Sequence, residues 1–188
     1  MADIPFLNPA ILKQLDLPVP SRETTPQLLE KLNLNRPYAP SIEIQSYRRL
    51  YGLDTLNCEH WQGFIEMPLF KLHVQAFQPK LPPQDKVKGT VVLLHGYLEH
   101  SGIYQPIIQE ILEQGFSVLT YDLPGHGLSN GSPASIQDFD HYQQVLHAVH
   151  QYVRHASQLP KPWLGIGQST GGAIWLHHLL EFAERRED

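Results

Sequence analysis

Hydrophobic positions follow two alternating patterns through the second half of the chain. Continuous apolar runs, typical of strands buried on both faces of a sheet, lie at 90–94, 116–121 and 162–166. Apolar positions at helical spacing follow each run, at 104–112, 136–155 and 173–176. Because strands that alternate with helices form βαβ units, the pattern predicts an α/β fold with a mostly parallel sheet and helices on both faces.

Residues 60–79 carry a different, alternating pattern, with Trp61, Phe64 and Met67 in its first part and an apolar side chain at every second position from Phe70 to Ala76. This spacing predicts two further strands, which Pro79, Pro82 and Pro83 bring to an end. The long helix over 136–155 is expected to bury one apolar face, made of Phe139, Tyr142, Val145, Leu146, Val149, Tyr152 and Val153.

The first 57 residues have the character of a helical arm, which we separate from a second unit over 58–188. Asn8-Pro9 and Thr25-Pro26 each place a capping residue before a proline, and they open short apolar segments at 11–15 and 28–34. Ser41 is expected to cap a third helix that ends at Gly52. The arm is either a lid-like surface element or a set of helices packed against the body, and the second interpretation is favoured.

Composition and charge restrict the classes of function. The 188 residues carry a net charge of −5, which argues against a surface for nucleic acid or anionic membrane. The single cysteine, Cys58, excludes an internal disulfide framework and suits a reducing compartment. No stretch of about 20 apolar residues and no signal peptide is found, so we expect no transmembrane segment and a cytoplasmic location.

The strongest candidate for chemistry is the turn Gly167-Gln168-Ser169-Thr170-Gly171, between the last apolar run and the last helix. Gly-x-Ser-x-Gly in a strand–turn–helix context is the sequence of a nucleophile elbow, where the serine occupies a strained turn and its neighbours must be small. The alternative is a glycine-rich turn with no catalytic role.

Two more turns follow predicted strands and reach the same edge of the sheet, where open α/β sheets bind ligands. They are His95-Gly96-Tyr97-Leu98-Glu99-His100-Ser101-Gly102 and Tyr121-Asp122-Leu123-Pro124-Gly125-His126-Gly127-Leu128-Ser129. Together with the Ser169 turn, and in this order, they resemble the α/β-hydrolase superfamily. The closest resemblance is to the branch of monoacylglycerol lipases, lysophospholipases and serine aminopeptidase-like hydrolases. It covers residues 60–188.

The resemblance assigns roles to three residues. Ser169 is implied as the nucleophile that forms an acyl-enzyme, and the backbone amides of Tyr97 and Thr170 as the oxyanion hole. His95 and His126 are expected to brace loops, and His177 lies about 12 Å along its helix from Ser169. We assign no cofactor and no metal, because no group of His, Cys, Asp and Glu has zinc-site spacing and no phosphate loop occurs.

The sequence departs from the family after the nucleophile. The family's triad runs Ser, then Asp or Glu, then His, but only 19 residues follow Ser169, with His177, His178 and Asp188 among them. The fold is therefore expected to be truncated after the nucleophile helix. An excised segment, a truncated gene product and one piece of a split protein remain open. The strand at 162–167 becomes an exposed apolar edge, so self-association is expected.

Three functions stay in competition. The first is a serine hydrolase of carboxylic esters, with a lipid-like substrate such as a monoacylglycerol or lysophospholipid, a class that the resemblance implies. The second is a catalytically incomplete fragment or pseudoenzyme that acts as an interaction module. The third is a peptidase of the same fold.

Overall fold

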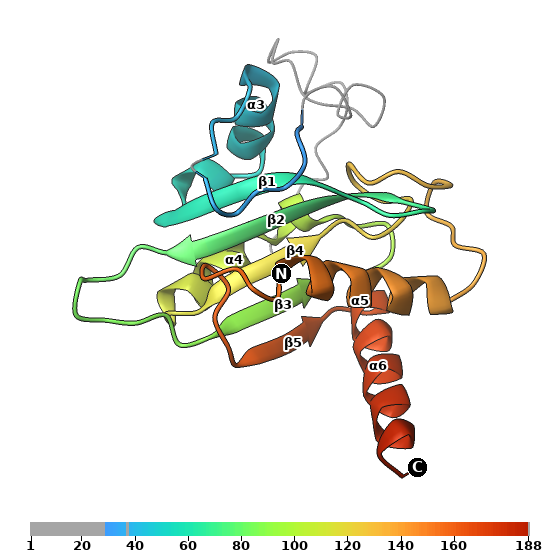
Figure 1. Ribbon diagram of the computed structural model, residues 1–188. Coiled ribbons are helices and arrows are strands. Elements are labelled where there is room, and N and C mark those ends of the chain that lie inside the picture. Colours follow the sequence, from blue (N-terminus) through green and yellow to red (C-terminus); the bar gives the residue numbers. More distant parts are fainter. Residues whose placement is uncertain (1–28, 37, 188) are drawn as a thin grey trace, which may run out of the picture.

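A five-stranded sheet runs through the computed structural model, which describes residues 29–36 and 38–187 (Figure 1). The strand order across the sheet is β1-β2-β4-β3-β5. The strands are β1 (Cys58–Glu66), β2 (Lys71–Pro79), β3 (Thr90–Leu94), β4 (Ser117–Tyr121) and β5 (Trp163–Gly167). Each strand predicted from the hydrophobic pattern is therefore present.

The sheet is mixed. Strand β3 pairs in parallel with β4 and β5, whereas β2 pairs antiparallel with β1 and β4. The turn between β1 and β2 is only four residues long, too short for the crossover that a parallel pair requires. The predicted βαβ units thus form the β4-β3-β5 half of the sheet, and the hairpin extends it on the other side.

Helices cover both faces of the sheet (Figure 1). They are α3 (Ile42–Leu50), α4 (Gln105–Glu113), α5 (Asp140–Val153) and α6 (Thr170–Glu187), with short 3-10 turns η1 (Leu53–Thr55) and η2 (Ser101–Tyr104). None of the helices in the described ranges has the length and apolar character needed to cross a membrane.

Alternation along the strands divides the core into two layers. Val91 and Leu93 of β3 point into the layer under α3 and α4, whereas Val92 and Leu94 point into the layer under α5 and α6. All four side chains are buried, as expected for a strand covered on both faces. The predicted α/β architecture with helices on both faces is confirmed.

Strand β5 is the edge of the sheet in the described part of the chain. Its only strand partner there is β3, and its side chains Leu164 and Ile166 are 45% and 43% exposed. The prediction of an exposed apolar edge at 162–167 is confirmed, because an apolar strand with a single neighbour keeps one side open.

Helix α5 is shorter than its apolar pattern predicts. It begins at Asp140, where the Asp138 carboxylate accepts the backbone amide of Asp140, and ends at Val153 rather than at His155. The predicted burial is also wrong for two residues of its apolar face. Phe139 is 39% exposed at the helix start, and Tyr152 is 40% exposed at the rim, where its hydroxyl donates to the Leu32 carbonyl.

The arm is helical only in part. Helix α3 is capped by the Ser41 side chain as predicted, and Gly52 follows it with φ 68°. The helix predicted over 28–34 is wrong for residues 29–34, which instead lie along β1 and exchange backbone hydrogen bonds with Phe64. Leu29, Leu32 and Leu34 are buried there, because the free edge of β1 offers backbone partners as well as apolar contacts. The segment predicted at 11–15 and Asp188 lie outside the described residues.

A buried carboxylate connects the loops at the carboxyl end of β4. Asp122 is fully buried, and its Oδ1 accepts both the backbone amide and the hydroxyl of Ser101, at 2.7 and 2.6 Å. Its Oδ2 accepts the Leu128 amide and His73 Nδ1, both at 2.8 Å. Three segments far apart in the sequence are thereby joined at one side chain.

Arg48 determines which atoms donate and which accept in the hydrogen bonds that lead to Asp122. Arg48 has only donors, and its Nε reaches Gln62 Oε1 at 3.1 Å. Gln62 therefore turns its NH2 group toward His73 Nε2, 2.8 Å away. Nε2 accepts, so Nδ1 carries the hydrogen that His73 donates to Asp122. Burial acts to raise the pKa of Asp122. Electrostatic attraction to His73 and the hydrogen bond that His73 donates outweigh the effect of burial and hold this pKa well below its ordinary value.

We expect Asp122→Asn to lower the free energy of unfolding at pH 7 by about 3–5 kcal/mol, because it leaves buried donors without their anionic acceptor. A carboxyl with a depressed folded-state pKa stabilises the fold above its unfolded pKa of roughly 3.9, and this contribution disappears as the pH falls further. The gap between wild type and variant should therefore narrow from pH 5 to pH 2. Urea unfolding at each pH measures the free energy of unfolding of wild type and variant, and Asp85→Asn, at an exposed position, is the control. A gap that stays constant with pH contradicts the assignment.

Candidate active site

Ser169 lies at the sharp turn between β5 and α6 and has a backbone φ of 48°. Few residues other than glycine adopt such a conformation, which costs an L-residue roughly 1–2 kcal/mol. A strained serine between a parallel strand and a helix is the backbone geometry of a nucleophile elbow. The local structure predicted from Gly-x-Ser-x-Gly is thus present.

The two glycines of the motif are required by close backbone approaches. A Cβ atom added to Gly167 would lie 2.3 Å from the carbonyl carbon of Gly171, and one added to Gly171 would lie 2.3 Å from the carbonyl oxygen of Leu94. The end of β3 and the start of α6 therefore pack against the elbow at distances that exclude any side chain.

The elbow leaves the backbone amide directly after the serine unused. The amides of Gly171 and Ala173 donate to the carbonyls of Gln168 and Ser169. The amide of Thr170 has no hydrogen-bond acceptor within the described ranges 29–36 and 38–187. It lies directly after Ser169, at the N-terminus of an 18-residue helix, where amide groups and the helix dipole favour a negatively charged oxygen.

The turn that contains Tyr97 follows β3, the neighbour of β5. The Tyr97 side chain is 55% exposed, and the centre of its ring lies 5.9 Å from that of the His126 ring. The amide before it, that of Gly96, donates to Glu99 Oε2 at 2.8 Å, whereas the Tyr97 amide has no acceptor among the residues that the structure describes. The Tyr97 turn therefore also offers a spare backbone donor.

Side-chain hydrogen bonds hold the Tyr97 turn against the elbow. Gln168, the residue before Ser169, donates from Nε2 to Glu99 Oε1 at 3.2 Å. The Tyr104 hydroxyl lies 2.9 Å from Gln168 Oε1 and is also hydrogen-bonded to Glu99 Oε2. Desolvation and the contact with Glu99 raise the pKa of Tyr104, so this hydroxyl keeps its proton as a donor. The structure thus brings together the turn of Tyr97 and the turn of Ser169 and Thr170, which are 72 residues apart in the sequence.

The side chains of Glu99, Tyr104 and Gln168 form a clamp between the two turns. This clamp is the part of the site that sequence reasoning missed. The sequence patterns place Glu99 in a turn, Tyr104 in a helix and Gln168 before the serine, but they do not indicate that the three side chains meet. The available signal was the presence of three polar, hydrogen-bonding residue types at the ends of two adjacent strands.

His95 braces the loops, as expected. Its Nδ1 lies 2.7 Å from the Gly96 carbonyl oxygen, and its Nε2 accepts the Leu123 amide at 2.8 Å. Burial lowers the pKa of His95, in agreement with a neutral ring whose Nε2 is an acceptor. His126 likewise contacts the Pro124 carbonyl through Nδ1, at 2.9 Å. Both rings therefore hold turns at the carboxyl edge of the sheet.

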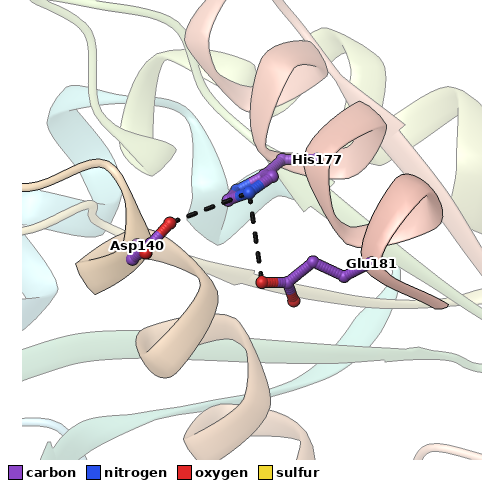
Figure 2. A group of neighbouring side chains, drawn as sticks. All are labelled: Asp140, His177 and Glu181. Carbon is purple, nitrogen blue, oxygen red and sulfur yellow. Dashed lines mark ion pairs between the residues drawn. The ribbon is translucent and has the colours of Figure 1, made fainter. Parts of the chain in front are cut away.

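His177 lies on α6, the unbroken helix that begins directly after Ser169, and is turned toward the start of α5 (Figure 2). Its Nε2 is 3.7 Å from Asp140 Oδ1 and 4.0 Å from Glu181 Oε1. This is the group of His, Asp and Glu in the described ranges whose ligand atoms converge closely enough to hold a metal ion. This group is not predictable from sequence spacing, because Asp140 is 37 residues away from His177.

Replacement of Ser169 by glycine should stabilise the fold relative to replacement by alanine. Both variants lack the hydroxyl, but only glycine adopts a φ of 48° without strain, so Ser169→Gly should exceed Ser169→Ala by about 1 kcal/mol in free energy of unfolding. Urea denaturation provides the measurement. At Ser157, which has no positive φ, the order should reverse. Equal stabilities of the two Ser169 variants would mean that the elbow is unstrained.

Comparison with known proteins agrees with this geometry. The chain is 32% identical over 117 residues to caffeoylshikimate esterase of Arabidopsis thaliana, covering 61% of this chain and 34% of that protein. It is 32% identical over 93 residues to monoacylglycerol lipase of Mycolicibacterium smegmatis, covering 49% and 32%. An esterase of Pyrococcus furiosus shares the fold with a TM-score of 0.53 at 23% identity, over 67% of this chain and 48% of the other.

The chain spans about a third of the length of these two curated relatives. The family model of the serine aminopeptidases, S33, matches residues 85–187, which is more than half of the chain and includes all three turns described above. A strand–serine–helix elbow on a mixed α/β sheet and this match agree: the chain belongs to the serine aminopeptidase S33 family of α/β hydrolases.

Proposed function

We propose that the protein is a serine hydrolase of carboxylic esters that works through an acyl-enzyme on Ser169. The observation that supports this proposal most strongly is the strained backbone of Ser169, with φ 48°, at the carboxyl end of β5. Strain of this kind persists where the surrounding structure enforces it, and it gathers at functional sites. Esterases and a lipase among the relatives favour an ester over other hydrolase substrates.

In the proposed reaction the Ser169 hydroxyl attacks the ester carbonyl carbon and loses its proton to a general base. The alcohol leaves with a proton, and water then hydrolyses the acyl-serine. The amides of Thr170 and Tyr97, which have no acceptor in the described part of the chain, are suited to receive the developing oxyanion. Each such donor is typically worth about 3 kcal/mol. We propose that the acid and base correspond to parts of the longer relatives that this chain does not span.

For the substrate we propose a lipid-like ester, either a monoacylglycerol or a lysophospholipid. The support is the similarity to a monoacylglycerol lipase and the residues of the three turns. A peptidase of the same fold is the alternative within the family, whose model carries a peptidase description. Comparing monoacylglycerol, lysophospholipid and amino-acid amide hydrolysis separates these possibilities.

A second candidate is an interaction module that keeps the elbow as a scaffold. The observation that favours it is that no histidine is hydrogen-bonded to the Ser169 hydroxyl among the described residues. Without a base a serine hydroxyl is a weak nucleophile, although an oxyanion hole and binding alone can retain a residual acceleration of order 10³–10⁴ over water.

Fluorophosphonate labelling and turnover of a p-nitrophenyl ester should both be lost in Ser169→Ala. The probe requires an activated serine, and Cys58 does not compete because burial raises the pKa of its thiol to about 11. Intact mass and ester hydrolysis are the measurements, with Ser157→Ala as the matched control. Folded wild-type protein that is neither labelled nor active would favour the interaction module, and turnover that persists in Ser169→Ala would exclude Ser169 as nucleophile.

We also propose that the protein is cytoplasmic and self-associates through the β5 edge. The location rests on the single cysteine. The association rests on the edge of β5 that stays unpaired among the described residues, where Leu164 and Ile166 are exposed, and on three leucines of α6 that are each more than half exposed, namely Leu176, Leu179 and Leu180. Between α5, β5 and α6 lies an apolar hollow of about 340 Å³, which is lined in part by Trp163, Trp175 and Leu179.

Sedimentation velocity should therefore find the wild-type chain as a dimer or larger species at micromolar concentration. Leu164→Lys should shift it toward monomer, because a lysine at an edge strand opposes strand pairing. Leu69→Lys, at an exposed position in the turn between β1 and β2, is the control. A monomeric wild type contradicts the proposed association.

A further inference from the structure

Three side chains from two helices converge at the contact between α5 and α6 (Figure 2). Asp140 comes from the first turn of α5. His177 and Glu181 come from α6, where a spacing of four residues places them on one face of the helix. All three point toward one common space in Figure 2. They belong neither to the elbow nor to the clamp that holds it.

The separations of their ligand atoms match the size of a small metal ion. His177 Nε2 lies 3.7 Å from Asp140 Oδ1 and 4.0 Å from Glu181 Oε1, and all three atoms lie within 4.8 Å of one another. The nearest point equidistant from three atoms with these separations is at most about 2.5 Å from each of them. Zn–N and Zn–O bonds are only slightly shorter, at roughly 2.0–2.2 Å. Small side-chain rotations, without any movement of the helices, close this difference.

The orientation of His177 and the local charge both suit a cation. The Nδ1 atom of His177 is buried and has no hydrogen-bond partner in the described part of the chain, so Nε2 is the nitrogen directed at the carboxylates. Two carboxylates held this close repel each other unless a positive charge lies between them. The side chain of Asp140 is 64% exposed, so an ion has a path from solvent.

From this geometry we infer that Asp140, His177 and Glu181 form a binding site for a divalent transition-metal ion, with zinc as the best-suited ion. Zinc binds both imidazole nitrogen and carboxylate oxygen, so one histidine and two carboxylates suit it, and a water molecule completes a four-coordinate site. The site joins the start of α5 to α6 and is independent of the ester chemistry proposed for Ser169. Because Nδ1 lacks the outer partner that strengthens metal-bound histidines, we expect micromolar rather than nanomolar affinity.

The test is a titration of the chelator-treated full chain with Co²⁺ and with Zn²⁺. We expect one saturable site, visible absorption bands of four-coordinate cobalt, and a rise in melting temperature with added zinc, because a ligand that binds only the folded state stabilises it. His177→Gln should weaken binding at least 100-fold, and Asp140→Asn and Glu181→Gln at least 10-fold each.

His178→Gln is the matched control, because His178 is next in the chain but packs against Trp175, outside the group. It should keep wild-type affinity and the zinc-dependent rise in melting temperature, which also guards against chance binding by the other histidines. Circular dichroism of each variant in chelator confirms that it folds. The inference is overturned if wild type shows no saturable binding, or if folded His177→Gln binds as tightly as wild type.

Discussion

The Asp122 carboxylate is the interaction on which the carboxyl edge of the sheet depends. It is fully buried and accepts four hydrogen bonds, from strand β2, from the segment that enters α4 and from the loop after β4. A buried charge is tolerated only when its partners are complete. These loops therefore have one arrangement in which the charge is satisfied, and the network from Arg48 through Gln62 and His73 enforces the same arrangement from the other side.

That constraint is transmitted to the elbow through short steps. Ser101, held by Asp122, begins the turn η2 that leads into Tyr104, and Tyr104 with Glu99 holds Gln168 beside Ser169. His95 connects the turn after β3 to the turn after β4 through the Leu123 amide. The strained serine is thus supported by contacts from two other loops, which is the condition under which backbone strain persists at a functional site.

Strand β5 and helix α6, which the elbow joins, have a different character. Strand β5 has one strand neighbour in the described part of the chain, and α6 presents several exposed leucines together with the Asp140–His177–Glu181 group. The loops that support the elbow are rich in satisfied polar contacts. By contrast, β5 and α6 expose apolar side chains, and the carboxylates of Asp140 and Glu181 share one histidine as their partner. Association and metal binding are both ways to satisfy groups of this kind.

Local patterns in the sequence determined the elements and the elbow. Apolar runs and apolar alternation predicted the strands, Ser41 predicted the cap of α3, and Gly167 and Gly171 predicted the strained turn, because each depends on neighbouring residues alone. Tertiary structure decided what depends on distant partners. Residues 29–34 pair with β1 instead of forming a helix, Phe139 and Tyr152 lie at a rim, Gln168 meets Glu99, and Asp140 meets His177. In each case the partner lies on another element, and only the packing of the elements determines which residues meet.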